Sequence, residues 1–305
     1  MSGIVLHSYD ASPFTQRVLR MLGLKNLEWR WVETPMMPPK DDLVALTGGY
    51  RGTPVLQLGS DIYIDSTLIA LELERRHPEP SLFPARDTGA SLELVAWHDS
   101  FFRAGLKIIL AMSAHAWPEP FRKDRESLFA DIDFDAAGLD LGCSRAQYRA
   151  HASLIDRQLA YGRPYLAGER AGFADAFAYP LLWFMRGALP AVANELLDGC
   201  RNIPAWESRI AALGEGRRTR IEASAAFDEA LSSKVREPPA VDPQDAQGLR
   251  EGMRVRIEPM DTRRGTVEGE VWVAQPNEIA IRRRHALTGA VTVHFPRIGY
   301  RVTPL

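Results

Sequence analysis

The spacing of apolar residues changes twice along this chain of 305 residues, and these changes limit the architectures that it can adopt. Up to about residue 80, short apolar runs typical of strands are interleaved with helical spacing. From about 88 to 232 only helical spacing is present, and from about 249 a period of two returns. The chain therefore predicts an α/β part, an all-α part and a small all-β part in succession.

Residues 1–80 carry strand and helix signals in the order β, α, β, an irregular or helical stretch, β, β and α. The predicted elements are Ile4–Tyr9, Pro13–Leu22, Glu28–Val32, Val55–Leu58, Ile62–Ile64 and Ser66–Arg76. Pro13 suits the first turn of a helix, where its missing N–H is not needed. Gly59-Ser60-Asp61 predicts a hairpin between the last two strands.

Residues 88–232 predict an all-helical domain, in which the polar stretch 113–143 is a long excursion between two helices. Residues 235–248 are rich in Pro and Asp and predict a linker. Residues 249–305 predict a small antiparallel β-module that packs independently. We therefore expect truncation after Ser233 to leave the chemistry of the preceding residues measurable.

Composition excludes several classes of protein. The 37 basic residues are offset by 39 acidic ones, so the net charge of −2 argues against a nucleic-acid-binding protein. Cys143 and Cys200 cannot build a disulfide scaffold and favour a reducing compartment. No apolar run has the length of a membrane span, and the N-terminus lacks a signal-peptide pattern, so we expect a cytoplasmic protein with no membrane partner. The seven histidines show no metal-site spacing, and no metal is expected.

Three short motifs in the first 70 residues are suited to binding a peptide-like anion. Ser12 precedes the first predicted helix, where a hydroxyl and free N–H groups can stabilise negative charge. Pro54 at the start of a strand favours a cis Thr53–Pro54 bond, which would leave the backbone of Val55 free to pair with an extended ligand. Asp65-Ser66 opens a helix and offers a carboxylate and a hydroxyl to a ligand residue that bears both charges.

In this order, and followed by an all-helical domain, Ser12-Pro13-Phe14, Thr53-Pro54-Val55 and Asp65-Ser66 resemble the N-terminal half of a cytosolic glutathione transferase. The resemblance covers about residues 1–232, with Gly172-Phe173-Ala174-Asp175 standing where an interior helix of the family begins. It implies a thioredoxin-like N-terminal domain, glutathione as cosubstrate and a homodimer. It also implies site residues: Ser12 as the catalytic hydroxyl, and Phe14, Thr53, Pro54, Val55, Asp65 and Ser66 as glutathione contacts.

The function that this resemblance implies is a detoxification-type transferase. The Ser12 hydroxyl would donate to the glutathione thiolate, which attacks an electrophilic carbon of an apolar compound. Glutathione would lie extended along the edge of the strand that begins at Val55. Because position 12 is not a cysteine, thiol–disulfide exchange is disfavoured.

Three features depart from the family pattern. Gly172 replaces the usual Ser or Thr cap, Thr47–Gly52 is unlike the usual loop before the proline, and residues 250–305 lie outside the common two-domain pattern. The loop and the extra strands keep a second function open, that of a non-catalytic interaction or assembly module. A glutathione-dependent dehalogenase, isomerase or peroxidase is a third.

Single residues also have more than one interpretation. Ser12 can be a helix N-cap only, and Tyr9 or, as a lesser rival, Thr15 can take its place at the thiolate. Asp65-Ser66 can be a plain helix start. Phe101 suits either the helical core or a pocket for the electrophile. Arg282-Arg283-Arg284 would alternate between the two faces of a strand, which favours a solvated surface over a nucleic-acid site.

Overall fold

The computed structural model describes residues 3–234, 239–262 and 264–305. It divides into two compact units. The first contains the chain up to Thr15, Glu28–Ile69 and the chain from Arg217 onward; the second contains Gln16–Leu27 and Ala70–Gly216. Residues 217–232, assigned from the sequence to the helical part, therefore belong with the N-terminal strands.

The sheet of the first unit begins with the four strands predicted from residues 1–80. They are β1 (Val5–Ser8), β2 (Glu28–Glu33), β3 (Val55–Leu58) and β4 (Asp61–Ile64). β1 is parallel to β2 and antiparallel to β3, and β3 and β4 form the predicted hairpin. Residues 1–80 also contain the helices α1 (Pro13–Leu24), α2 (Asp41–Thr47) and α3 (Ser66–Arg76), of which most of α1 and α3 belongs to the second unit. The thioredoxin-like order is confirmed, and the stretch left open by the sequence contains α2.

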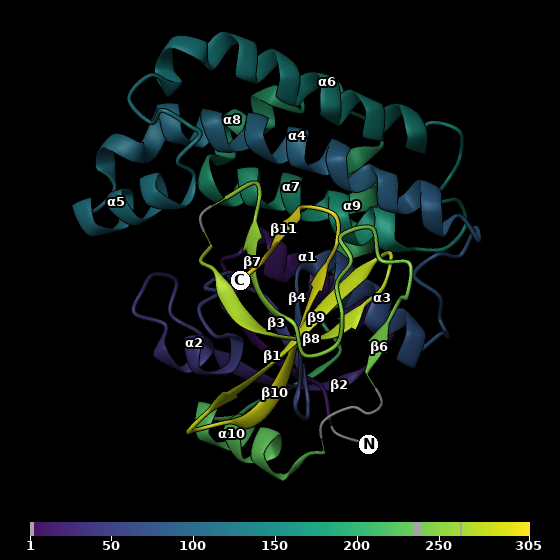
Figure 1. Cartoon of the computed structure of the whole chain (residues 1–305). Helices are drawn as coiled ribbons and strands as arrows, with labels where there is room; N and C mark the ends of the chain where they lie inside the picture. The colour runs from purple at the N-terminus through teal and green to yellow at the C-terminus, as the bar shows by residue number, and fades with distance from the viewer. Residues whose placement is uncertain (1–2, 235–238, 263) are drawn as a thin grey trace. The chain divides into compact units, whose positions relative to one another are not determined.

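The C-terminal strands continue this sheet (Figure 1). β10 (Gly289–Pro296) runs parallel to β4, and Val293 lies opposite Ile62. Outward from β10 follow β9 (Glu278–His285), β8 (Val267–Ala274), β7 (Arg254–Pro259) and β11 (Tyr300–Pro304). The β-rich C-terminal part is confirmed. The expectation that it packs independently is wrong, because its strands share a sheet with β4.

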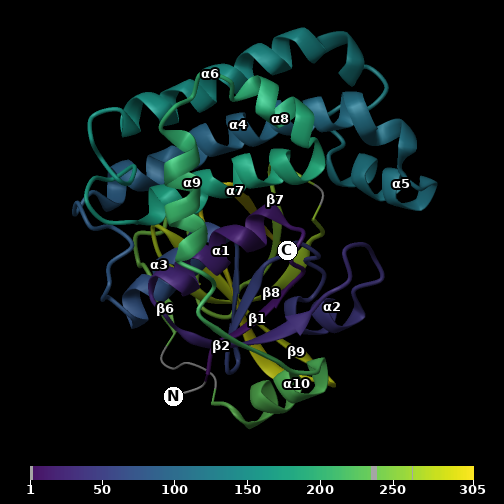
Figure 2. The same cartoon turned by 180° about the vertical axis from the view of Figure 1, so that it is seen from behind.

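The C-terminal strands also share a hydrophobic core with the N-terminal elements of the first unit. The alternating apolar residues of β7 to β11, among them Ile257, Ile281 and Val293, are buried in one cluster with Leu46 and Ile62. Helix α10 (Ala223–Ser232) adds Phe227 and Ala230 to this cluster and contacts β10 (Figure 2). A separate core for some 58 residues would be small, and sharing one buries more apolar surface per residue.

Two short strands escaped sequence-based prediction. β5 (Arg217–Arg220) pairs in parallel with β2, at the other end of the sheet. β6 (Ala240–Val241) pairs with β8, so the predicted linker 235–248 contains a strand, and its residues 235–238 lie outside the described residues. Both strands are short and polar or flanked by proline, which leaves little periodic signal.

The second unit is helical, as predicted. Its helices are α4 (Thr88–Ser113), α5 (Glu119–Leu128), α6 (Leu141–Leu159), α7 (Phe173–Ala188), α8 (Pro190–Leu196) and α9 (Ile203–Ala212). α4 packs against both α6 and α7 (Figure 1). Phe101 of α4 is fully buried against Tyr148 and His151 of α6, so it is a core residue of this unit. The excursion 113–143 contains α5.

The start of α7 explains why a glycine stands at position 172. A Cβ on Gly172 would lie 2.7 Å from the carbonyl oxygen of Leu82, which also accepts a hydrogen bond from the N–H of Phe173. The carboxylate of Asp175 caps the helix by accepting from the N–H of Gly172 at 3.0 Å, and it also accepts from the indole N–H of Trp206 at 2.7 Å. Half of the usual capping box is therefore present without a Ser or Thr, because the carboxylate of Asp175 accepts from the N–H of the N-cap residue.

His294 of β10 lies fully buried between charged residues of β4 and β9. Its Nδ1 is 2.5 Å from a carboxylate oxygen of Glu278, and its Nε2 is 3.2 Å from one of Asp61. The ring stacks on Tyr63, with centroids 4.4 Å apart. Burial lowers the pKa of His294, but the hydrogen bonds and negative charges of Asp61 and Glu278 outweigh it and hold the pKa above its ordinary value. His294 thus links the C-terminal strands to β4 electrostatically.

We expect His294 to stabilise the fold in its charged form. Because its pKa is raised in the folded state, the stabilisation is complete below the unfolded-state pKa and is lost as the pH rises through the folded-state value. His294→Gln should therefore lower the free energy of unfolding more at about pH 6 than at about pH 9. Urea denaturation at both pH values measures this, with His115→Gln, a change at an exposed histidine, as the control. A loss independent of pH would contradict the charged state.

Candidate functional site

The register of the sheet brings the three N-terminal motifs to one end of it. His7 near the end of β1 lies opposite Val55 at the start of β3, and Val55 lies opposite Ile64 at the end of β4. The segments that follow β1, precede β3 and follow β4 therefore emerge side by side. These segments carry Ser12, Thr53-Pro54 and Asp65-Ser66. Residues that are more than 50 positions apart in the sequence thus converge on one place.

Ser12 caps helix α1. Its Oγ accepts a hydrogen bond from the N–H of Thr15 at 3.2 Å, and its side chain and backbone are almost fully buried. The N-cap interpretation is therefore confirmed as a structural role. This capping hydrogen bond does not use the hydroxyl hydrogen of Ser12. Within the described part of the chain, the Ser12 hydroxyl donates to no acceptor. The Ser12 O–H can still donate to a ligand anion at the helix N-terminus.

The Thr53–Pro54 peptide bond is cis, as expected from the sequence. β3 itself is not an edge strand, because β1 pairs with it on one side and β4 on the other. The prediction that a ligand lies along the edge of this strand is therefore wrong. A ligand backbone can approach only its N-terminal end, at Thr53-Pro54-Val55, where the chain enters the sheet.

Asp65 and Ser66 form the turn from β4 into α3. Asp65 has a φ of +79°, a left-handed conformation that Asp and Asn tolerate better than other residues with a side chain. Its Oδ1 accepts from the N–H of Thr67 at 2.8 Å, and its backbone oxygen accepts from Ile69. The second carboxylate oxygen and the partly exposed position leave Asp65 able to receive a ligand ammonium. Ser66 is buried as the first residue of α3.

Tyr9, the rival of Ser12, is partly exposed just after β1. The ammonium of Lys40 lies 5.3 Å from the centre of its ring and donates to the carbonyl oxygen of Arg51 at 3.1 Å. Tyr9 is thus held beside the loop that precedes Thr53, on the same side as the three motifs.

The unusual loop Thr47–Gly52 and the C-terminal strands prove to be parts of one contact. The N–H of Arg51 donates to the carbonyl oxygen of Arg264 at 2.8 Å. A Cβ on Gly49 would collide with the carbonyl oxygen of Thr266, so the backbones meet where only glycine fits. The guanidinium of Arg283 donates to the carbonyl oxygens of Ala45 and Leu46 at the end of α2. The loop Thr47–Gly52 therefore packs against the C-terminal strands.

The arginine triplet behaves differently from its prediction as a solvated surface. Arg283 donates to the carbonyl oxygen of Ala45 in α2, whereas Arg282 stacks on Trp272, 3.9 Å from the ring centre. Arg284 is exposed. The expected alternation along β9 is present, but one of its faces is an internal contact.

A charged cluster from the C-terminal strands lies beside the predicted ligand contacts. Arg264, between β7 and β8, has its guanidinium 5.6 Å from the ring centre of Phe14 and 3.3 Å from a carboxylate oxygen of Asp261. Burial lowers the pKa of Arg264, but Tyr50, Asp261, Tyr300 and Asp65 together raise it, so the group stays charged. Burial raises the pKa of Tyr50 and of Tyr300, which keeps both phenols neutral.

Sequence reasoning missed Tyr50, Arg264 and Tyr300. The only signal that pointed toward them was the departure of Thr47–Gly52 from the family pattern. A Cβ on Gly52 would lie only 2.4 Å from the hydroxyl oxygen of Tyr50 and would clash with it. Tyr50 therefore packs directly against the residue that precedes Thr53. Nothing in residues 250–305 indicates contact with this loop, because the contact joins segments some 200 residues apart.

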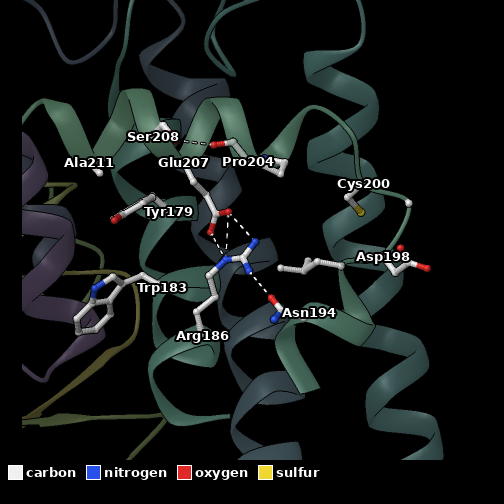
Figure 3. Close-up of a pocket in the computed structure, with 12 residues that line it drawn as sticks. Tyr179, Trp183, Arg186, Asn194, Asp198, Cys200, Pro204, Glu207, Ser208 and Ala211 are labelled. Carbon is white, nitrogen blue, oxygen red and sulfur yellow. Dashed lines mark hydrogen bonds and ion pairs between the residues drawn. The ribbon is translucent and has the colours of Figure 1, made fainter. Parts of the chain in front are cut away.

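The helical unit contains a separate pocket of about 680 Å³. Arg186 of α7 donates to both carboxylate oxygens of Glu207 of α9, from Nε to Oε1 and from Nη2 to Oε2 at 2.8 Å each, and it also donates to Oδ1 of Asn194 (Figure 3). These charged groups satisfy one another, as in a structural ion pair. None of the site residues predicted from the sequence lines this pocket.

Two features are absent from the described residues. Within residues 3–234, 239–262 and 264–305, no group of three or more His, Cys, Asp or Glu side chains is arranged to hold a metal ion. Over the same residues, no helix is both long and apolar enough to cross a membrane. Cys143 and Cys200 are free cysteines in the helical unit.

The sequence matches two family models: the glutathione S-transferase N-terminal domain over residues 6–81 and the C-terminal domain over residues 114–209. No curated protein matches it. More distant solved structures share the fold. One is the beta-etherase LigF of Sphingobium sp. strain SYK-6, 18% identical over 69% of this chain and 95% of its own, with a TM-score of 0.54. Another is a glutathione transferase family member from Pseudomonas fluorescens pf-5 with two glutathione bound, 14% identical over 69% of this chain and 88% of its own, with a TM-score of 0.50.

A GST-like protein from Pseudomonas syringae is similar over the whole chain. It is 32% identical, its structure covers 100% of both chains, and the TM-score is 0.82. The β-rich C-terminal extension is therefore part of the shared fold. On the strength of the two domain models and this full-length relative, the chain belongs to the glutathione S-transferase family.

Proposed function

We propose that the protein is a glutathione transferase that activates the thiolate of glutathione for attack on an apolar electrophile. The observation that carries the proposal is the convergence of Ser12, Thr53-Pro54-Val55 and Asp65-Ser66 at one end of the sheet. Glutathione would set its sulfur at Ser12, its backbone at Val55 and its γ-glutamyl end at Asp65 and Ser66, with Phe14 beside it. The bound glutathione of the Pseudomonas fluorescens relative supports the ligand class.

In this proposal Ser12 acts as a hydrogen-bond donor and keeps its proton. A hydrogen bond to a charged group contributes about 1.5–3 kcal/mol, and a helix N-terminus about 0.3–1 kcal/mol. At about 1.4 kcal/mol per pKa unit, these effects lower the pKa of a thiol, ordinarily about 8.5, by between one and three units. A lowering by more than about 1.5 units makes the thiolate the major form at neutral pH. It attacks the electrophilic carbon, and a leaving group departs with the electron pair of the bond that breaks.

The remaining features of the proposal follow from family membership. We propose a cytoplasmic homodimer that acts in detoxification, and a small electrophilic compound as the second substrate. Size-exclusion chromatography with light scattering tests the dimer, and a panel of aryl halides, epoxides and peroxides tests the electrophile.

Binding of glutathione to Asp65→Asn tests the proposed site. Asn tolerates the left-handed conformation at position 65 and keeps an oxygen for the N–H of Thr67, so this variant removes the charge with little change in shape. We expect the affinity for glutathione to fall by about tenfold, as for loss of one charge-assisted contact. Turnover at saturating glutathione should change little, because the contact is present in ground and transition states alike.

Isothermal titration calorimetry measures the affinity, and Asp228→Asn, which makes the same charge change at an exposed position of α10, is the matched control. Unchanged affinity in Asp65→Asn would remove Asp65 from the site. Absence of glutathione binding by the unmodified protein would favour the non-catalytic interaction module instead.

A further inference from the structure

We propose that Arg264, supplied by the C-terminal strands, binds the α-carboxylate at the γ-glutamyl end of the ligand. The inference rests on the proposed glutathione site and extends it: the site is completed by a residue from outside the two common domains. Arg264 and Asp65 would then recognise the two opposite charges of one amino-acid group, the carboxylate and the ammonium.

The position of Arg264 is set by rigid contacts. Its carbonyl oxygen accepts from the N–H of Arg51, and a Cβ on Gly265 would collide with the carbonyl oxygen of Gly49. These contacts hold Arg264 and Gly265 against the segment that leads to Thr53-Pro54. The guanidinium then lies 5.6 Å from the ring centre of Phe14, and the negative charge of Asp65 is among those that act on it.

The described contacts leave the guanidinium with unused hydrogen-bonding capacity. Its side chain is 15% exposed, and its only ion-pair partner among the described residues is Asp261, whose side chain is 40% exposed. That pair is made by Nη2 at 3.3 Å. A guanidinium carries five N–H donors in a fork that matches a carboxylate. A ligand carboxylate can therefore accept from the donors that Asp261 leaves unused.

The surroundings favour a carboxylate over a larger anion. Tyr50 and Tyr300 are both buried and remain neutral, so they add no charge near Arg264. Asp65 brings one negative charge to the same place and would repel a phosphate or a second carboxylate. An amino acid group, with one ammonium for Asp65 and one carboxylate for Arg264, balances these charges.

A cycle of two proteins and two ligands tests the inference. The proteins are the unmodified chain and Arg264→Met; the ligands are glutathione and 4-aminobutanoyl-Cys-Gly, which lacks only the α-carboxylate. For glutathione we expect Arg264→Met to weaken binding by at least about tenfold, or about 1.4 kcal/mol. For the decarboxylated peptide the two proteins should bind within about twofold of each other. Arg264→Lys keeps the charge but not the forked donors, so its affinity for glutathione should lie between those of the unmodified protein and Arg264→Met.

Arg284→Gln, which removes an exposed positive charge from β9, is the matched control and should bind both ligands normally. Equal weakening for both ligands, or unchanged binding of glutathione, would overturn the inference. Tighter binding by Arg264→Met would also overturn it and would mean that the arginine plugs the site. If Arg264→Met does not fold, the same comparison is made with Arg264→Lys. Failure of the unmodified chain to bind glutathione would instead refute the proposed function itself, and the inference with it.

Discussion

Truncation after Ser233 is expected to leave a protein that does not fold cooperatively. The cut removes β10 from its pairing with β4 and takes the apolar side chains of β7 to β11 out of the shared core. Leu46, Ile62 and Phe227, which are buried in the intact chain, would then face water. The truncated chain should be largely insoluble or show no cooperative thermal transition by circular dichroism. This reverses the expectation from the sequence, which treated the C-terminal strands as independent.

A matched pair of point variants tests the same idea without removing the strands. Ile281 of β9 is fully buried in the shared core, whereas Ile298 is 89% exposed between β10 and β11. Ile281→Ala should lower the free energy of unfolding by about 2–5 kcal/mol, and Ile298→Ala by less than about 0.5 kcal/mol. A soluble truncated protein that melts cooperatively would show that the first unit folds without these strands.

Ser12→Ala is expected to lower turnover with an aryl-halide acceptor by about 10- to 100-fold at neutral pH, the equivalent of one hydrogen bond to a charged group. Affinity for glutathione should change much less, since the hydroxyl is proposed to act on the sulfur and not on the peptide. The pH profile should shift, because the bound thiol would ionise at higher pH without its donor. Stopped-flow measurement of the thiolate absorbance against pH gives this value directly.

Two companion variants separate the roles that Ser12 combines. Ser12→Ala also removes the oxygen that accepts from Thr15, and loss of an N-cap costs about 1 kcal/mol of stability. Ser12→Asp keeps a capping oxygen but has no hydroxyl to donate at neutral pH, so it should restore stability and not turnover. Tyr9→Phe should retain turnover. If Tyr9→Phe loses activity and Ser12→Ala does not, the thiolate donor is Tyr9.

Local signals were enough to predict most of the elements. Pro13, the Gly59-Ser60-Asp61 turn and the alternation beyond residue 250 each act over a few residues, and the corresponding helix, hairpin and strands are present. The sequence also indicated the cis Thr53–Pro54 bond and the cap at Ser12. Elements with weak periodicity, such as β5 and α5, were missed or taken for loop.

What the sequence by itself determined is therefore the identity of the segments and the family-type motifs that they carry. Only the tertiary structure decided that β10 pairs with β4, that β3 is an interior strand, and that Arg264 lies beside Phe14. The physical reason is the sequence separation of the residues that interact. Turns, caps and periodicity depend on neighbours within a few residues, whereas strand pairing and the shared core depend on which distant apolar faces fit together. The local sequence pattern does not indicate which distant strands pair or which apolar faces share a core.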